Sequence, residues 1–528
     1  MNIKTPSAIA SPAAPVNQAT KKHLRGSALL LVGRVIAMAT NFAIQILIVR
    51  YLSKSEYGAF AYVMSLVSLG SSLAVFGMDK TVTRFLPIYQ ERGEHPKLFG
   101  TMILMVTTIL SLSFFLVLLI FGMQGWLAES LINDQQAVRL LLLLVFLVPI
   151  QALDSLMVGM LAIFSRPSTI FFRRHILGPG LKLLVVLLLM LLGLNVYFLS
   201  TGYVIAGALG VTIYSGILIR DLRQNQELWK HFDFQKIKFP IKEIFGFSTP
   251  LLTTNLVYVI RSQLVVVLLQ YFRNTLDVAT FRAVQPVADL NTVVIQSFSL
   301  LFMPAMARMF AKKDREGIND LYWQSAIWIT VISFPIFLVT FSLAQPLTLL
   351  LFGERYAQSG LIMAMLAFGY YFNAALGFNA DTLRVYGKLR YTVAIDFLAM
   401  LISLGLSLIL IPRYGAVGAA LGTCGTLVLY NILNHIGLKF ATEINLFRWR
   451  YFKVYASIAL GTLGLMIFQR LVSLPIYIDL VLAGLISLIV LLINRNVLNM
   501  EETFPELLRF QIVRFLFQTH RRKDQVPL

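Results

Sequence analysis

The feature that most constrains this chain is a series of apolar segments, each about as long as a membrane-spanning helix, that recur almost without pause. A helix needs about 20 apolar residues, at about 1.5 Å of rise per residue, to cross the hydrocarbon core of a bilayer. The sequence therefore predicts an all-α polytopic membrane protein with about 14 transmembrane helices. The predicted spans are residues 24–49, 57–78, 99–122, 140–164, 176–194, 199–219, 245–270, 281–307, 323–351, 360–382, 391–411, 414–437, 453–469 and 476–494. Pro412 is the predicted break between the eleventh and twelfth spans.

The composition agrees with a membrane protein and excludes several other classes. Hydrophobic residues make up 58% of the 528 residues and charged residues 13%. A soluble domain has about 45–50% apolar and about 25% charged residues. A soluble fold of this size would need more charge to cover its surface, because charged side chains stay outside. These values exclude a soluble enzyme, a disordered chain and a collagen-like fibre.

A shift of about 220 residues gives a weak self-match, in which Tyr51-Leu52 falls on Tyr271-Phe272. Six inserted spans restore the original orientation, so the two halves are predicted to be parallel repeats related by an axis along the membrane normal. The predicted divisions are 1–23 (mobile cytoplasmic tail), 24–219 (N-terminal six-helix bundle), 220–244 (interfacial linker), 245–437 (C-terminal six-helix bundle), 438–494 (two additional spans) and 495–528 (cytoplasmic amphipathic tail).

The basic residues between the spans predict the orientation of the chain. With the N-terminus inside, 34 of the 45 Lys and Arg residues fall in inner segments, eight in outer segments and three within spans. Positive residues gather on the cytoplasmic side of membrane proteins, so both termini are predicted to lie in the cytoplasm, with the chain in the cell (inner) membrane. The net charge of +20 matches anionic lipid of the inner leaflet and is not interpreted as a nucleic-acid interface.

Polar and ionisable residues within the spans indicate a functional site, because each costs on the order of 2.5–3.5 kcal/mol to insert. Arg34, Asn41 and Gln45 are spaced by seven and four residues, which places them on one face of the first span. Tyr258 and Arg261 share a face of the seventh span. The repeat shift carries Asn41 onto Arg261, so the two faces correspond.

The eighth span adds Arg282 and Asp289, and the fourth adds Asp154. One hypothesis is a wet central cavity in which Arg34, Arg261 and Arg282 hold a phosphate-bearing head group through paired hydrogen bonds. The alternative is that these charges neutralise one another inside the fold, for example Arg34 with Asp154 or Asp289. The two hypotheses are compatible.

Four other ionisable residues lie within a turn or two of a predicted boundary. They are Lys182, Asp381, Asp396 and Asp479. Long side chains near a helix end reach the interface with their charged group, so snorkelling accounts for these positions.

Motifs for catalysis and for cofactors are missing. The sequence has no GxxxxGK[ST] loop to hold ATP, and no GxSxG, HExxH or CxxC. Cys424 is the one cysteine, and the six histidines lie far apart in the sequence. We therefore predict no cofactor and no metal site, and we favour transport over catalysis.

Four short segments resemble the polysaccharide-transporter (oligosaccharide flippase) branch of the multidrug/oligosaccharidyl-lipid/polysaccharide flippase superfamily. The similarity covers about residues 21–440, and the order and spacing of the segments support it. The segments are RYLS at 50–53 with EYG at 56–58, LFGERY at 351–356, and LIPRYGAVGAA at 410–420.

This resemblance implies two six-helix lobes with alternating access. It implies movement of an undecaprenyl-pyrophosphate-linked oligosaccharide from the inner to the outer leaflet, for O-antigen, capsule or exopolysaccharide assembly. The implied partners are this lipid-linked oligosaccharide, membrane lipids, and polysaccharide polymerases and glycosyltransferases. Many relatives carry an acidic residue near the position of Ser262-Gln263, and this sequence does not. Fourteen spans also resemble the lipid II flippase branch.

The predicted roles follow from these two lines of argument. Pyrophosphate binding is assigned to Arg34, Arg261 and Arg282, contacts with phosphate or sugar to Asn41, Gln45 and Tyr258, and speculative ion coupling to Asp289 or Asp154. Two other functions stay open. An ion-coupled multidrug exporter would need an acidic, aromatic pocket for cations, and a membrane glycosyltransferase or polymerase would need accessible carboxylates at an aqueous surface.

Overall fold

The described part of the chain is helical and contains no strand. The computed structural model describes residues 18–132, 134–165, 167–224, 226–230, 232–442, 444–445, 447–472, 474–498, 500, 511, 514 and 517. The first half contains α1 (Gln18–Tyr51), α2 (Lys54–Val75), α3 (Met78–Glu91), α4 (His95–Gly122), α5 (Gln124–Trp126), α6 (Gln135–Leu144), α7 (Leu147–Phe164), α8 (Pro167–Phe171), α9 (Gly178–Leu191), α10 (Val196–Gln224) and α11 (Gln226–Trp229). The second half contains α12 (Ile241–Phe272), α13 (Thr275–Asp289), α14 (Val293–Ala311), α15 (Arg315–Ser342), α16 (Ala344–Phe352), α17 (Ser359–Ala375), α18 (Asn379–Val385), α19 (Leu389–Thr442), α20 (Phe452–Leu471) and α21 (Ile476–Leu498). Short π-helical turns lie at Leu127–Leu131 and Phe172–Leu177, and 3₁₀ turns at Phe234–Lys236, Leu290–Thr292, Glu354–Tyr356 and Trp449–Tyr451.

The termini differ in part from the prediction. Helix α1 begins at Gln18, so the last residues of the predicted 1–23 tail belong to the first helix. Residues 1–17 and most of the predicted 495–528 tail lie outside the described residues. The predicted linker 220–244 contains the end of α10, the short helix α11 and the start of α12, and its Lys238 amide donates to the Pro96 carbonyl at 3.2 Å.

The predicted membrane spans are present. Among the described residues, 12 helices are long and apolar enough to cross a membrane, and the bent pair α13–α14 makes up to 13. Helix α19 counts once in that number, although its 54 residues as a straight rod would reach about 80 Å, more than twice the thickness of a hydrocarbon core of about 30 Å.

Helix α19 is a hairpin of two spans. Gly415 has φ 56° and ψ −131°, a backbone conformation that favours glycine, and the chain reverses there. The two legs touch along their length, because the Tyr391 hydroxyl donates to the Leu433 carbonyl at 2.8 Å. Counting both legs gives the predicted fourteen spans. The break lies three residues beyond the predicted Pro412, because the reversal requires a positive φ, which proline cannot adopt.

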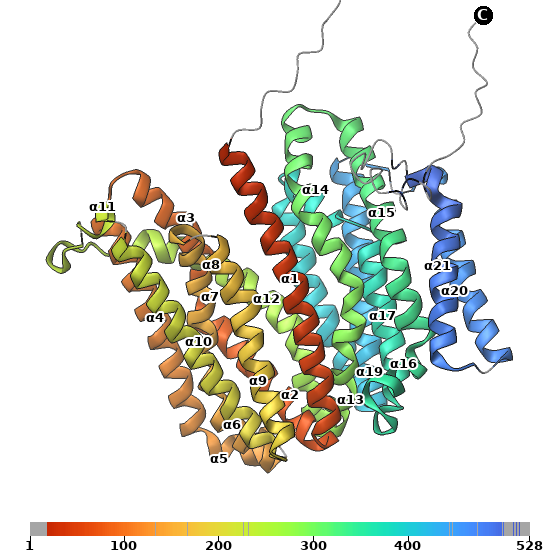
Figure 1. Cartoon of the computed structure of the whole chain (residues 1–528), viewed down its shortest axis with the longest axis horizontal. Helices are drawn as coiled ribbons and strands as arrows, with labels where there is room; N and C mark the ends of the chain where they lie inside the picture. Colours follow the sequence, from red (N-terminus) through yellow and green to blue (C-terminus); the bar gives the residue numbers. More distant parts are fainter. Residues whose placement is uncertain are drawn as a thin grey trace, which may run out of the picture.

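Figure 1 shows how the helices are grouped. Helices α4, α7 and α10 lie on one side, α15, α17 and α19 lie on the other, and α1 passes between the two groups. Helices α20 and α21 stand at the outer edge of the second group. One buried apolar cluster joins α2, α4, α7 and α10 with α12 and α13, and a second joins α14 and α15 with α20 and α21. The residue limits of the predicted domains stay a prediction.

In each half, a side chain caps the N-terminus of the helix that follows the first long helix. Ser53 caps α2 in a capping box: its Oγ accepts from the Glu56 amide at 3.2 Å, and Glu56 Oε2 accepts from the Ser53 amide at 3.0 Å. In the second half, Asn274 Oδ1 accepts from the Asp277 amide at 3.0 Å at the start of α13. Both sharp turns therefore join a long first helix to a capped second helix, as the internal repeat predicts.

Helices α2 and α13 approach closely at Gly58. A Cβ on Gly58 would lie 2.0 Å from the Thr275 carbonyl oxygen, which is backbone and cannot move aside cheaply. Gly58→Ala is therefore expected to destabilise the protein by about 1–3 kcal/mol, as overpacking does. The thermal unfolding midpoint of the purified protein measures this effect. Gly216→Ala on α10 is the matched control, since no atom lies within 4 Å of its added Cβ; equal midpoints for the two variants would contradict the prediction.

Candidate functional site

A cavity of 1390 Å³ lies between α1 and α2 on one side and α13 and α14 on the other. Five of the residues predicted from the sequence line it: Arg34, Asn41, Gln45, Arg282 and Asp289. The structure thus brings together polar residues from both halves of the chain. The other polar side chains in its lining are Tyr57, Ser65, Arg174, His175, Lys182, Tyr203, Gln263, Thr292, Gln296 and Ser297.

Arg282 is held in this cavity by neutral groups. Its Nη2 donates to Ser65 Oγ at 2.7 Å and to Gln263 Oε1, and its Nη1 donates to Gln285 Oε1 at 2.9 Å. Its Nε is buried and has no hydrogen-bond partner in the described part of the chain. A guanidinium fixed by amides and a hydroxyl keeps its full positive charge available to a ligand, because no carboxylate neutralises it.

Arg34 is linked to the second half by a chain of hydrogen bonds. Its Nη2 donates to Gln296 Oε1 on α14, whose Nε2 donates to Thr292 Oγ1 at 3.1 Å. The Thr292 hydroxyl in turn donates to Asp289 Oδ1 at 3.1 Å. The direct pairing of Arg34 with Asp154 or Asp289 does not occur, because Gln296 lies between Arg34 and Thr292, and Asp154 is engaged elsewhere.

Asn41 and Gln45 face the cavity from α1, as the helical spacing predicts. Gln45 Nε2 donates to the Tyr57 hydroxyl at 2.5 Å, and Asn41 Nδ2 donates to the Ala37 carbonyl at 2.8 Å. Asn41 Oδ1 is left free for other donors by these contacts, and Asn41 is exposed. The two amides therefore give this wall both donor and acceptor groups.

Tyr258 and Arg261 do not line this cavity. The Arg261 guanidinium lies over the Tyr430 ring at 5.0 Å and within 6.0 Å of the Tyr258 ring, which is 65% exposed. The face of α12 that carries them turns toward the second leg of α19, whereas Gln263, two residues further on, faces the cavity. The structure therefore brings two of the three predicted arginines together and places the third in a different environment.

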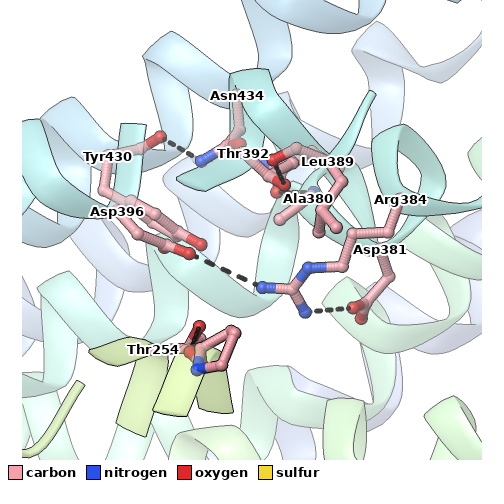
Figure 2. A network of polar contacts seen from close by, with 11 residues as sticks. Thr254, Ala380, Asp381, Arg384, Leu389, Thr392, Asp396, Tyr430 and Asn434 are labelled. Atoms are coloured by element: carbon pink, nitrogen blue, oxygen red, sulfur yellow. Dashed lines mark hydrogen bonds and ion pairs between the residues drawn. The ribbon is translucent and has the colours of Figure 1, made fainter. Parts of the chain in front are cut away.

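A separate polar network lies beside α12 (Figure 2). Arg384 Nη1 donates to Asp381 Oδ1 at 3.1 Å, and its Nη2 lies 3.8 Å from Asp396 Oδ2. Thr254 and Tyr430 lie close to this trio in the figure. Asp381 and Asp396 lie near the ends of their spans, as predicted, and both carboxylates pair with one arginine of α18.

A smaller chamber of 400 Å³ adjoins the main cavity within the first half of the chain. Asn41, Met64, Arg174, Lys182 and Tyr203 line both spaces, so the two lie side by side at these residues. We call it the side chamber. Its other lining residues are Leu147, Ile150, Gln151, Asp154, Ser155, Val158, Arg173, Gly178, Pro179, Ala206, Gly207, Gly210, Val211 and Tyr214.

The predicted residue Asp154 lies in the side chamber and is paired. Its Oδ1 accepts from Arg173 Nη2 at 2.5 Å, and the Arg173 guanidinium lies 3.6 Å from the centre of the Tyr214 ring. Arg173 is buried, whereas the Asp154 side chain is 45% exposed, and the pair links α7 to the turn before α9. Asp154 is thus paired with Arg173, a residue near it in the sequence, and not with Arg34.

The sequence analysis missed Lys182 and Arg174 as cavity residues. Lys182 was placed near a helix end because the span was predicted to begin at residue 176, but the span runs continuously over Ser168–Leu191. Lys182 therefore lies near its middle, and its ammonium faces the Tyr203 ring at 5.7 Å.

Asp479, also assigned to snorkelling, is 5% exposed and accepts from Gln469 Nε2 at 3.2 Å.

The lining of the main cavity and of the side chamber is predominantly basic. Their lining contains five basic side chains and two carboxylates. One carboxylate, Asp154, is bound to Arg173, and the other, Asp289, accepts from Thr292. Enclosed positive charge of this kind attracts anions, because the low-dielectric walls strengthen each interaction. The described residues contain no group of three or more His, Cys, Asp or Glu side chains able to hold a metal ion.

Two arginines link the two halves of the chain where α1 ends, at the end of the bundle opposite the start of α1 (Figure 1). Arg50, at the end of α1, donates through Nε to the Leu351 carbonyl at 2.7 Å and through Nη2 to the Leu350 carbonyl. Arg355 Nη2 donates in return to the Val49 carbonyl at 2.8 Å and to the Arg50 carbonyl. Each arginine thus satisfies carbonyls at a helix end of the opposite half, where cations are favourable. We call this pair the arginine clamp.

One family model matches more than half of this chain. Residues 47–361 match the family described as polysaccharide biosynthesis protein. An uncharacterised membrane protein of Methanocaldococcus jannaschii, MJ1068, is 21% identical over 423 residues, which cover 76% of this chain and 81% of that protein. The capsular polysaccharide biosynthesis protein CapF of Staphylococcus aureus is 24% identical over 191 residues, which cover 36% of this chain and 48% of CapF.

Solved structures show where this fold occurs. The lipid II flippase MurJ in an inward closed conformation matches with a TM-score of 0.69 at 14% identity, over 89% of this chain and 100% of that chain. An inward-facing multidrug resistance transporter of the MATE family and MOP superfamily matches with a TM-score of 0.60 at 14% identity, over 78% of this chain and 98% of that chain. At such identities the likeness concerns the fold.

Proposed function

This chain belongs to the polysaccharide biosynthesis protein family, a family of membrane transporters, and we propose that it moves a polyprenyl-pyrophosphate-linked oligosaccharide from the inner to the outer leaflet of the cytoplasmic membrane. The product serves assembly of a cell-surface polysaccharide such as O-antigen, capsule or exopolysaccharide. CapF, a relative, is named for capsular polysaccharide biosynthesis, and MurJ, which has a similar fold, is named as a flippase of lipid II.

One observation carries this proposal: the guanidinium of Arg282 lies in a large cavity and has only neutral partners. A pyrophosphate offers the acceptor oxygens and the negative charge that this group lacks. Arg34 supplies a second cation from the opposite wall, with Asn41 and Gln45 beside it for phosphate or sugar hydroxyls. A cavity for drug cations would need carboxylates in place of these arginines.

The polyprenyl tail stays outside the protein along α1 and α14. Val32, Val35 and Ile36 are 44–61% exposed on α1, next to Arg34. The contact of Arg34 with Gln296 bridges α1 and α14 at this level, so this contact has to open for a head group to enter the cavity while its tail remains in lipid. The apolar exposed side chains here have the chemistry that a hydrocarbon chain prefers.

We further propose that the protein works by alternating access, with both termini in the cytoplasm. The arginine clamp then closes the outer end in the present conformation, and release of the cargo requires it to open. Asp289 carries the proposed ion coupling, because it lines the cavity and is connected to Arg34 through Thr292 and Gln296. Asp154 is a weaker candidate for this role, since Arg173 holds its carboxylate.

Reconstitution of the purified protein tests the proposal. Vesicles carry a fluorescent polyprenyl-pyrophosphate-linked oligosaccharide, and a membrane-impermeant quencher reports how much of it reaches the outer leaflet. Protein-dependent movement is expected, together with at least about tenfold slower movement for Arg282→Ala, since a hydrogen bond to a charged group contributes about 1.5–3 kcal/mol. Movement of ethidium without movement of the lipid would indicate a multidrug exporter, and new glycosidic bonds from a nucleotide sugar would indicate a glycosyltransferase.

A further inference from the structure

The charged residues of the side chamber are different from those to which pyrophosphate binding is assigned. Asp154 is the one carboxylate in its lining, and that carboxylate is bound to Arg173. Lys182 and Arg174 therefore face the chamber without a bonded carboxylate among the lining residues. Lys182 contacts the face of the Tyr203 ring at 5.7 Å, which orients its ammonium but does not neutralise it.

The size and walls of the side chamber suit one sugar unit. Its 400 Å³ lies at the small end of the range of about 300–1,000 Å³ found for ligand pockets, so it accommodates a monosaccharide-sized group and not a whole oligosaccharide. Gln151, Ser155 and Asn41 provide amide and hydroxyl groups for sugar hydroxyls, and the Tyr203 ring provides an aromatic surface.

The position of the chamber relates it to the cargo. It adjoins the main cavity, and Asn41, Arg174, Lys182 and Tyr203 line both spaces. A group that binds there is therefore close to a head group held by Arg34 and Arg282. The sugar units next to the pyrophosphate are the parts of the proposed cargo that lie nearest to this boundary.

We propose that the side chamber binds a carboxylate-bearing sugar of the cargo, such as a uronate, and that Lys182 with Arg174 recognises its carboxylate. This inference rests on the proposed function and specifies its substrate class as an acidic oligosaccharide. Two cations that lack a bonded carboxylate, beside neutral hydrogen-bonding groups, are the arrangement that discriminates an acidic sugar from its neutral counterpart. A neutral sugar would leave three cations, Arg173, Arg174 and Lys182, against the one carboxylate of Asp154 in the chamber lining.

Binding of two sugar phosphates to the purified full-length protein at pH 7 tests this inference. The probes are glucuronic acid 1-phosphate and glucose 1-phosphate, which differ in one carboxylate, and calorimetry measures their dissociation constants. We expect the intact protein to bind the uronate about tenfold more tightly, which corresponds to one charge-assisted hydrogen bond. Lys182→Met and Arg174→Gln are each expected to reduce this preference to about twofold or less, because each removes a cation that the carboxylate contacts.

A control and a second variant keep the result interpretable. Lys312→Met, at the end of α14 and outside both spaces, removes the same charge and should keep the tenfold preference. If Lys182→Met does not elute as a folded protein on size exclusion, Arg174→Gln carries the test. Equal affinities for the two probes in the intact protein, or a preference that survives in each folded variant, would overturn the acidic-sugar inference.

The same titration separates this inference from the proposed function. Inorganic pyrophosphate, as a third probe, should bind the intact protein and bind Arg282→Ala at least about tenfold more weakly. If pyrophosphate binds in this way and the two sugar phosphates bind equally, only the acidic-sugar inference fails. If neither pyrophosphate nor glucose 1-phosphate binds, the proposed function fails.

Discussion

Gln263→Glu is expected to slow transport of the lipid-linked oligosaccharide by about 100-fold, the largest effect of any single change in the cavity. Gln263 Oε1 accepts from Arg282, and a glutamate there would place a full negative charge against the guanidinium. The ion pair would satisfy Arg282 from within the protein, so the pyrophosphate would have to displace it. A 100-fold effect corresponds to about 2.7 kcal/mol, which is within the range of one buried charge-assisted interaction. Vesicle transport with equal amounts of inserted protein measures the loss.

The matched control for this prediction is Gln263→Met. Methionine has a similar length and no charge, so Arg282 loses one neutral acceptor but keeps its positive charge. Transport by Gln263→Met is expected to stay within about threefold of the unaltered protein, because the pyrophosphate can itself accept the hydrogen bond that Arg282 no longer donates to residue 263. If Gln263→Met is as defective as Gln263→Glu, the packing of Gln263 matters and its charge does not. Normal transport by Gln263→Glu would remove Arg282 from the proposed binding site.

Loss of the arginine clamp is expected to open the end of the bundle opposite the start of α1. The double variant Arg50→Ala, Arg355→Ala removes four hydrogen bonds between the two halves. If these bonds contribute even about 1.4 kcal/mol in sum, the open state gains about tenfold in population. Ala61 lines the cavity on α2 and is 9% exposed, so a cysteine there reports opening.

The measurement uses the labelling rate of Ala61→Cys by a membrane-impermeant maleimide added from outside intact cells. Cys424→Ser removes the one native cysteine, which otherwise reacts as well. The rate is expected to rise at least about tenfold when the clamp is removed. Arg470→Ala, at the end of α20, is the control, because it removes a basic residue at the same end of the bundle from a helix that does not line the cavity. An unchanged rate in the double variant would show that the clamp does not hold this end closed.

The spans were predictable because membrane helices need only local information. Each span is a run of apolar residues of sufficient length, and its backbone hydrogen bonds close within the helix itself. Even the α19 hairpin was predicted as two spans, although the break occurs at Gly415 and not at Pro412. The resemblance to the oligosaccharide flippases was confirmed, since the family match covers residues 47–361.

The cavity residues could be predicted only where they share one face of a single helix. Arg34, Asn41 and Gln45 share a face of α1, and all three line the cavity. Arg261 was assigned to the same cavity by the repeat shift, but a shift aligns positions along a helix and does not set the rotation of α12 against its neighbours. That rotation places Gln263 in the cavity and Arg261 on Tyr430.

The sequence by itself determined that this chain is a membrane protein of many helices, which residues carry charge within the bilayer, and which family the chain resembles. Hydropathy and charge are properties of single residues, so no contact between distant residues is needed to read them. Only the tertiary structure decided which charges are neutralised. Asp154 pairs with Arg173, while Arg282 and Lys182 have no carboxylate bonded to them among the described residues, and each outcome depends on how separate helices pack against one another.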